Sequence, residues 1–449
     1  MSKRYRPYQP NQCYLLPQSP DEWLPEDHLA RFVSDIVDAL DLSGIYAFYE
    51  KELRGYPPYN PCMMVKVLIY AYSTGVYSSR KIERCISESI AFRYLAAGNF
   101  PDFRTINSFR KRHLAEFEKL FMEVIGLCQE AGLVKLGTIA IDGTKIKANA
   151  SKHKAMSYGR MKKEEARLEA EVERLMAQAE KTDQEEDERH GDRRGDELPD
   201  ELGTTKKRLA KIQEAKAALE AKAQAKAEAE SSDDKDDDGD PPASESPPME
   251  VDDKAQCNFT DPDSRILKGP GKHQFIQGYN VQVAVDAESQ VILSNIVHQS
   301  SVDVHQFTSA LDEVESNVGR PLRVVADAGY YSQGNVDEAR RRKVAPFIPP
   351  DRVKHNEWRG PGPRGPIPKD ATSAKRMSRF IRTKRGKQIY KLRQQSVEPV
   401  FGQIKSVRGF RSFSLRGLDN VTGEWTLVAL AHNMLKLFRA SPRAAAAGI

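Results

Sequence analysis

The sequence predicts an α/β fold: a mixed sheet flanked by helices, with an all-helical domain before it and a helical-hairpin insertion after its first strand. Three observations predict this class. Apolar residues recur every three or four positions in residues 1–135, as in amphipathic helices. From residue 138 apolar residues alternate with a period of two, as in strands. Heptad-like spacing then fills much of 155–255. A chain of 449 residues has room for two or three domains.

Residues 1–135 are predicted to form a helical DNA-binding domain. Separate helices are indicated by "PEDHLARFVSDIVDALDL", by the apolar run from Pro61 to Gly75, by residues 78–98 and by a segment that begins near Asp102. Helices joined by a glycine-containing turn, the last one rich in Arg and Lys, suit a helix-turn-helix. A plain helical bundle with a basic rim remains the alternative. The candidate DNA contacts on the last helix are Arg104, Arg110, Lys111 and Arg112.

The second predicted domain spans residues 136–440. Its elements follow in the order strand 138–147, insertion, an antiparallel hairpin within 275–300, helix, strand "RVVADA", helix, short strand "VAPFIP" and a late helix that contains Glu398. Three antiparallel strands followed by parallel strands with helices on both sides are typical of the ribonuclease-H-like architecture. The final apolar helix is expected to cover the sheet.

The insertion, residues 155–255, is predicted to be a coiled-coil-like helical hairpin followed by a disordered acidic stretch. Its first helix has Leu168, Val172, Leu175 and Ala179 at heptad spacing, and "TKKRLAKIQEAKAALEAKAQAKAEAE" repeats the pattern. A polar connector, "TDQEEDERHGDRRGDELPDELG", separates the two helices, and "DDKDDDGDPPASESPPM" follows them.

Charge is unevenly distributed along the chain. The formal net charge is +5, but residues 375–416 contain thirteen Lys or Arg against one acid, whereas residues 231–240 contain six Asp against one Lys. A basic cluster of this density points to a polyanion partner, with a merely solvated face as the alternative. A Pro/Gly-rich basic loop, residues 351–389, is expected to contact the phosphate backbone of DNA.

The five cysteines are far apart and show no CxxC spacing, which argues against a disulfide framework and against a zinc site. The N-terminal residues lack a signal-like apolar stretch. The most apolar run, "MMVKVLIYAY", is short and contains Lys66. We therefore expect a cytoplasmic, nucleoid-associated protein without a membrane span.

Two aspartates stand at notable places in the predicted strands. Asp142 lies at the centre of "TIAIDGTKIK", and Asp327 follows the strand in "RVVADAGYYS". The first and fourth strands of such a sheet are neighbours, so the two carboxylates can face each other. Carboxylates held together need a cation between them or a bound proton. An aspartate before a glycine, such as Asp142 before Gly143, is by itself more often a turn residue.

Glu398 is the third candidate. It lies on an amphipathic helix in "YKLRQQSVEPVFGQIKSVRG" and is the only acid of the basic stretch 375–416. Metal ligation would explain why an acid is placed inside a phosphate-binding surface. Oxygen ligands and the lack of metal-spaced Cys or His favour two Mg²⁺ or Mn²⁺ ions. Two such ions can activate a water or a 3′-hydroxyl and stabilise the leaving oxygen of a phosphodiester.

These segments resemble the DDE-type transposases of bacterial insertion sequences, in the branch with a Y-R-E-K signature. "AIDGTKIKANAS" resembles the first-aspartate motif, "VVADAGYYSQGN" the second, and "VEPVFGQIKSVRGFRSFSLRG" the glutamate motif. Residues 60–113 resemble the N-terminal DNA-binding helices of these proteins, so the resemblance covers nearly the whole chain. It implies a DNA transposase that cleaves and transfers strands with Asp142, Asp327 and Glu398 as its catalytic triad.

The resemblance also implies that Tyr390, Arg393 and Lys405 position DNA phosphates. Four residues separate Arg393 from Glu398 where the family has three, whereas the six between Glu398 and Lys405 agree. The extra residue turns Arg393 by about 100° around a helix. A helix interruption near Gln394 or Gln395 would restore the family geometry.

The expected partner is double-stranded DNA, both the element ends and the target, bound by a homodimer because two ends must be paired. Three other functions stay open at this stage. A ribonuclease-H-fold endonuclease would cleave without joining. A catalytically decayed derivative would only bind DNA, although the three acids argue against it. A scaffold built on the insertion would depend on residues 160–250.

Overall fold

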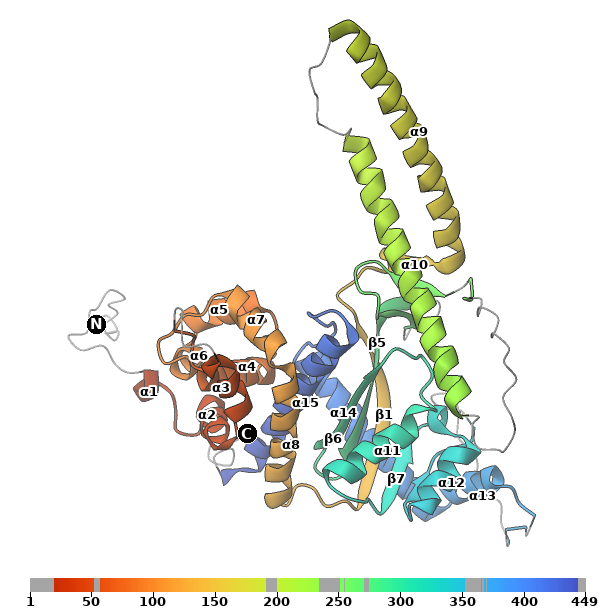
Figure 1. The fold of residues 1–449 in the computed structure, drawn as a ribbon. Coiled ribbons are helices and arrows are strands. Elements are labelled where there is room, and N and C mark those ends of the chain that lie inside the picture. The colour runs from red at the N-terminus through yellow and green to blue at the C-terminus, as the bar shows by residue number, and fades with distance from the viewer. Residues whose placement is uncertain are drawn as a thin grey trace, which may run out of the picture.

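A computed structural model gives the fold of the chain (Figure 1). It describes residues 20–51, 57–190, 200–233, 251–253, 255–269, 274–351, 365, 367–368 and 370–442. The predicted class is confirmed: a mixed, curled sheet lies between helices, and a helical region precedes it. No helix in these ranges is both long enough and apolar enough to cross a lipid bilayer.

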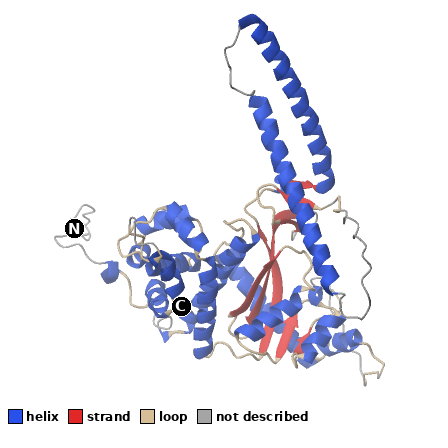
Figure 2. Ribbon diagram, viewed as in Figure 1, coloured by secondary structure: helices blue, strands red, loops and turns tan. Residues whose placement is uncertain are grey.

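The central sheet, whose strands are red in Figure 2, has the order β4-β5-β1-β7-β8, with β6 also paired to β5. β1 pairs antiparallel with β5 and parallel with β7, and β7 pairs parallel with β8. The pairing of β1 with β7 is the neighbour relation between the first and fourth strands that the sequence predicted. The strands are β1 (Thr138–Lys147), β4 (Arg265–Lys268), β5 (Phe275–Asp286), β6 (Ile292–His298), β7 (Arg323–Ala326) and β8 (Ala345–Phe347).

Two features of the strands were not predicted. β4 adds a short antiparallel strand to the start of β5. β2 (Ala155–Ser157) and β3 (Gln256–Asn258) form a small second sheet that closes the base of the insertion. Both additions are too short to give a periodic pattern, because three or four residues cannot show an alternation.

Helices cover both faces of the sheet. In Figure 1, α11 lies in front of the strands and α14 and α15 lie behind them. The helices of this part are α11 (Gln306–Asn317), α12 (Gln333–Arg341), α13 (Ser373–Ile381), α14 (Lys384–Gly402) and α15 (Leu418–Ala440). Short helical turns span Lys152–Lys154 and Ala328–Tyr330, and a π-helical turn spans Gln403–Val407.

The N-terminal helices begin at residues that cap them. Asn60 accepts a hydrogen bond from Met63 N at α4, and Asp102 accepts one from Thr105 N at α7. The helix predicted over 78–98 is broken: Ser89 is extended (φ −106°, ψ 129°) and separates α5 from α6. The helices are α1 (Pro20–Trp23), α2 (Leu29–Ala39), α3 (Ser43–Glu50), α4 (Pro61–Ser73), α5 (Ser79–Glu88), α6 (Ile90–Leu95), α7 (Phe103–Arg112) and α8 (Leu114–Glu130).

α15 joins the N-terminal helices to the sheet. It packs against α4 and α8 on one side and against β6 on the other. It is buried almost all round, including Trp425 and the polar residues Glu424, His432 and Asn433. One apolar core therefore runs from the N-terminal helices through α15 into the sheet. The N-terminal helices are held by packing, not by a linker alone.

The insertion is a long helical hairpin, as predicted, that projects from the body in Figure 1. α9 (Tyr158–His190) and α10 (Asp200–Asp233) share a small core that includes Leu168 and Ile212. The helices extend into the stretch predicted to be a polar connector, because its Glu, Gln and Arg residues are good helix formers. Of the predicted acidic, disordered stretch, most lies outside the described residues.

Candidate active site

Asp142, in the middle of β1, lies beside Asp327, which directly follows the end of β7. In the parallel pair β1–β7 the last registered partners are Ile141 and Ala326, so the two aspartates occupy the next position. Neighbouring strands are about 4.8 Å apart, and matched positions of a parallel pair place their side chains on the same face. Each carboxylate accepts a local backbone N–H: Gly143 N at 2.9 Å and Gly329 N at 2.7 Å.

Gly143 does not lie in a turn. The alternative that Asp142 is only a turn residue before a glycine is therefore excluded. Gly143 lies within β1, opposite Gln282 of β5. A Cβ at Gly143 would collide with the Gln282 side chain. Tyr330 donates a hydrogen bond to Gln282 Oε1, and Gln282 Nε2 donates one to Asp303 Oδ1 (2.7 Å). The glycine thus makes room for a buried polar chain beside the aspartates.

Glu398 reaches the same region from α14, which lies against β1, β5 and β7. Ser396, Val397 and Val400 of this helix are buried. Glu398 lies at the rim, and its side chain is 46% exposed. The sequence segments of the three predicted acids are therefore brought to one place, two by strand pairing and one by a helix across them.

Arg393 lies between the acids. Its Nη1 donates to Asp142 Oδ2 at 2.7 Å, and its Nη2 donates to Glu398 Oε1 at 3.1 Å. The Arg393 side chain is only 15% exposed. A guanidinium that forks to two carboxylates is a strong, charge-assisted contact. It occupies the position at which a cation would neutralise Asp142 and Glu398 together.

An interruption of α14 near Gln394 or Gln395, which would have restored the family geometry, is not found: the helix continues through both residues. Pro399 lacks an N–H for the carbonyl of Gln395, and Gln290 Nε2 donates to that carbonyl at 3.0 Å instead. The departure from α geometry comes later, in the π-helical turn Gln403–Val407.

Burial raises the pKa of Asp142 to about 7. The Arg393 guanidinium and the Gly143 N–H lower it, and the nearby carboxylates of Asp327 and Glu398 raise it. Burial also raises the pKa of Tyr330, with Asp142, Asp303 and Asp327 adding to the effect. The carboxylates are thus close enough to act on one another electrostatically. This is the environment in which a divalent cation is favoured.

Within the described ranges, no three Asp, Glu, His or Cys side chains approach closely enough to form a metal site. The donor set nevertheless fits a hard divalent cation, since it consists of carboxylate oxygens alone. The Arg393 guanidinium marks a place for positive charge between two of them. The residues present therefore fit Mg²⁺ or Mn²⁺, provided that Arg393 moves.

Lys405 and Tyr390 lie near the acids, but their side chains contact other groups. Lys405 Nζ donates to Thr144 Oγ1 and, at 2.8 Å, to the carbonyl of Lys145, both on β1. Burial lowers the pKa of Lys405 to about 8, and the charge of Arg411 adds to this shift. Tyr390 packs against the apolar cluster of Val336, Met377 and Ile381.

The four N-terminal cations do not share one environment. Arg104, Lys111 and Arg112 are exposed on α7. Arg110 is 2% exposed. It donates to Tyr72 Oη (2.7 Å) and lies 3.7 Å from Glu424 of α15. The burial of Arg110 corrects our prediction for it, because a guanidinium enclosed in the core cannot reach a phosphate.

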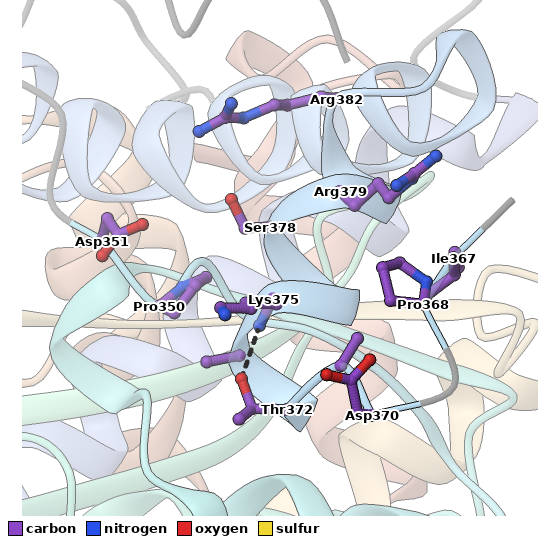
Figure 3. A pocket seen from close by; sticks show the side chains of 12 residues that line it. Pro350, Asp351, Ile367, Pro368, Asp370, Thr372, Lys375, Ser378, Arg379 and Arg382 are labelled. Carbon is purple, nitrogen blue, oxygen red and sulfur yellow. Dashed lines mark hydrogen bonds between the residues drawn. The ribbon is translucent and has the colours of Figure 1, made fainter. Parts of the chain in front are cut away.

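The predicted basic loop 351–389 is described only in part, since residues 352–364, 366 and 369 lie outside the described ranges. Its second half contains α13. A hollow of about 560 Å³ lies beside this helix, with the cations Lys375, Arg379 and Arg382 and the acids Asp351 and Asp370 in its lining (Figure 3). The mixture of signs leaves it a weaker anion site than the sequence alone suggested.

Gln282, Tyr330 and Asp303 were missed as neighbours of the acids. A signal was present: Asn280 and Gln282 take alternate positions in the apolar strand "GYNVQVAVD", so two amides face the same side of a buried strand. Buried amides require hydrogen-bond partners.

Comparison with protein families identifies the chain. A model described as "Transposase DDE domain" matches residues 257–434, and one described as "Transposase domain (DUF772)" matches residues 18–112. Asp327 and Glu398 lie in the first region, the N-terminal cations lie in the second, and Asp142 lies in neither. Searches of curated proteins and of solved structures returned no match. The matches to both halves of the molecule show that the chain belongs to the DDE-type insertion-sequence transposases, which act on DNA.

Proposed function

We propose that Asp142, Asp327 and Glu398 are the catalytic carboxylates of this transposase and hold two Mg²⁺ or Mn²⁺ ions at the scissile phosphodiester. The observation that carries the proposal is the fork of Arg393 between Asp142 and Glu398, with Asp327 at the matched position of the neighbouring strand. Carboxylates from three separate segments are gathered around one positive charge.

The chain's own groups have distinct parts in the reaction. Bound divalent ions would supply activation of a water or 3′-hydroxyl and stabilisation of the leaving oxygen. Arg393 releases the carboxylates and turns its guanidinium toward a DNA phosphate, for which its planar donors are suited. Asp303, Gln282 and Tyr330 fix the relative positions of β5 and the turn after β7. Lys405 remains anchored on β1 and offers a point charge beside the acids.

DNA recognition in this proposal is divided between two parts of the chain. Residues 1–135 bind the element ends through Arg104, Lys111 and Arg112 on the exposed face of α7. Residues 136–440, interrupted by the insertion 155–255, carry out the chemistry, with Tyr390, Arg393 and Lys405 near the DNA backbone. We propose a homodimer on DNA, because two ends must be paired. The role of Arg110 in this proposal is structural only.

A cleavage assay with single isosteric substitutions tests the proposal. Asp142→Asn, Asp327→Asn and Glu398→Gln should each lower the rate of end cleavage in Mg²⁺ by at least about a thousandfold, since each removes a charged ligand. DNA binding measured in EDTA should remain within a few-fold of the wild type. Asp337→Asn, an exposed aspartate on α12, is the control and should cleave normally. Cleavage by Asp327→Asn at the wild-type rate would falsify the assignment.

Strand transfer is tested with a pre-cleaved element end and a plasmid target. Joined product is expected, and it should disappear in the same three variants. Cleavage of an uncut end without any joining of a pre-cut end would instead indicate an endonuclease.

A further inference from the structure

The surface beyond the end of β1 is strongly cationic. Residues 145–154 and 411–416 contain six Lys or Arg and no acid. Five of these cations are exposed, and we call them the β1-end cationic surface: Lys147, Lys152, Lys154, Arg411 and Arg416. Lys147 lies in the first-aspartate motif, and Arg411 and Arg416 lie in the glutamate motif, but none of the five was among the DNA contacts predicted from the sequence.

Backbone contacts fix the two segments against each other. Lys147 N donates to Arg411 O at 3.3 Å, and Phe413 N donates to Lys147 O at 2.8 Å. The Asn149 side chain donates to Ser414 O at 2.8 Å, and Arg416 Nε donates to Asn149 O at 2.9 Å. The cations therefore stand on a framework that is tied to β1, not on a loose loop.

Two adjacent hollows open on this surface and share Ala148 and Ala150 as their floor. One, of about 490 Å³, is lined by Lys147, Lys152 and the start of β5. The other, of about 440 Å³, is lined by Lys154, Arg416 and short polar side chains. Neither lining contains an acidic residue. A neighbouring apolar side chain, Phe275, is 51% exposed at the edge of the first hollow.

The ammonium groups of Lys147, Lys152 and Lys154 make no ion pair or hydrogen bond with any described residue. Each is therefore available to an external anion without first breaking an internal contact. By contrast, many other exposed cations of the chain are paired, such as Lys119 with Glu116 and Arg341 with Glu338. A patch of unpaired cations without acids is the electrostatic footprint of a polyanion site.

The surface continues the line of β1 away from Asp142. Lys147 lies five positions after Asp142, a distance of about 17 Å along a strand. Lys405, bonded to Thr144 and Lys145, lies between the two. Asp142 and Lys147 are an odd number of positions apart on β1, so their side chains point to opposite faces of the sheet. Only a duplex that passes beyond the end of the strand can therefore contact both.

We propose that the β1-end cationic surface binds the phosphate backbone of the DNA duplex that extends from the scissile phosphate. The direction of this path rests on the proposed catalytic role of Asp142, whereas the binding itself does not. The proposed contacts are to phosphates and therefore carry no sequence information. The duplex comes either from the element end or from the target.

Binding in EDTA tests the proposal on the full-length protein, with the triple variant Lys147→Gln/Lys152→Gln/Lys154→Gln. Each lost phosphate contact lowers the steepness of log K against log [salt] by about 0.9, so the slope should fall by about 2.7. The wild type should then lose about 40-fold more affinity than the variant between 50 and 200 mM salt. The matched control is Lys119→Gln/Lys135→Gln/Arg341→Gln, which removes the same charge from exposed positions elsewhere.

Two 40-base-pair duplexes distinguish the source of the DNA, one with the element's terminal sequence and one with that sequence scrambled. A lower slope on the terminal duplex alone assigns the surface to the element end. A lower slope on the scrambled duplex, alone or as well, assigns it to target DNA or to both. An unchanged slope on both duplexes, or an equal change in the control variant, overturns the proposal. Repeating the comparison in an Asp142→Asn background separates it from the catalytic assignment.

Discussion

In the proposed metal site, Arg393 would compete with metal ions for the oxygens that it contacts on Asp142 and Glu398. Arg393→Gln removes this internal cation, so we expect Mn²⁺ to bind at least about tenfold more tightly to the DNA-free variant, a change of about 1.4 kcal/mol. Electron paramagnetic resonance of free Mn²⁺ at pH 8 measures this affinity. Arg393→Lys, which keeps the charge, is the control and should stay closer to the wild type. Weaker Mn²⁺ binding by Arg393→Gln would mean that the arginine organises the site instead of filling it.

The pKa of Asp142 predicts how metal binding depends on pH. Burial raises this pKa to about 7, so without metal the carboxyl is neutral below pH 7 and ionised above it. Metal needs the carboxylate, and a proton therefore competes with it. We expect Mn²⁺ affinity to be constant above about pH 8 and to fall by up to about tenfold per unit below pH 7. An affinity that does not change between pH 6 and pH 8 would contradict the raised pKa.

Among the single residues of the site, the acids could be predicted from the sequence, but the side chains around them could not. Asp142 and Asp327 stand out because a charge within or directly after an apolar strand is costly unless it is used. Arg110 has the same appearance in the sequence as Arg112, two positions later. Only tertiary packing turns Arg110 toward Glu424 and leaves Arg112 exposed. The one local signal is the spacing: Arg110 lies four positions after Ile106 and seven after Phe103, on the buried face of α7.

Among the elements, α15 holds the start of β6 with a single side chain. Asn433 is fully buried, its Oδ1 accepts from Ile292 N, and its Nδ2 donates to Ile292 O, both at 2.8 Å. Asn433→Ala leaves two backbone groups of β6 without partners, at about 1–3 kcal/mol each. We therefore expect a loss of about 2–6 kcal/mol in the free energy of unfolding, measured with urea. Asn420→Ala, which removes a rim hydrogen bond on the same helix, should cost much less.

The elements were predicted best where a pattern was long. β1 and the helical hairpin were read from clear periods of two and seven. The break at Ser89 was missed because residues 78–98 have helical periodicity on both sides of it. The ends of α9 and α10 were missed for the opposite reason: a charged connector with good helix formers shows no apolar periodicity.

In the whole molecule, a buried polar cluster ties the N-terminal helices to the catalytic part. Arg110 of α7 and Tyr72 of α4 meet Glu424 of α15, which also accepts from Ser414 N (2.9 Å) and Leu415 N (3.0 Å). The movement of one part is therefore coupled to the other. The strand order that places Asp142 beside Asp327 was predictable, but this joint was not, because its partners are more than 300 residues apart.

Breaking this joint should destabilise the protein. Arg110→Met leaves Glu424 buried without its cation, which costs about 3–5 kcal/mol. The double variant Arg110→Met/Glu424→Gln should recover part of that loss, and urea unfolding of the four proteins in the cycle measures the coupling. If Arg110→Met kept wild-type stability and weakened DNA binding instead, Arg110 would be a DNA contact after all.

The position of bound metal tests the central claim most directly. Crystals of the protein with cleaved element-end DNA and Mn²⁺ would locate manganese by anomalous diffraction. We expect two manganese peaks at coordination distance from carboxylate oxygens of Asp142, Asp327 and Glu398, with the Arg393 guanidinium moved onto a phosphate. Manganese bound elsewhere, while Arg393 still bridges Asp142 and Glu398 in the presence of DNA, would contradict the account.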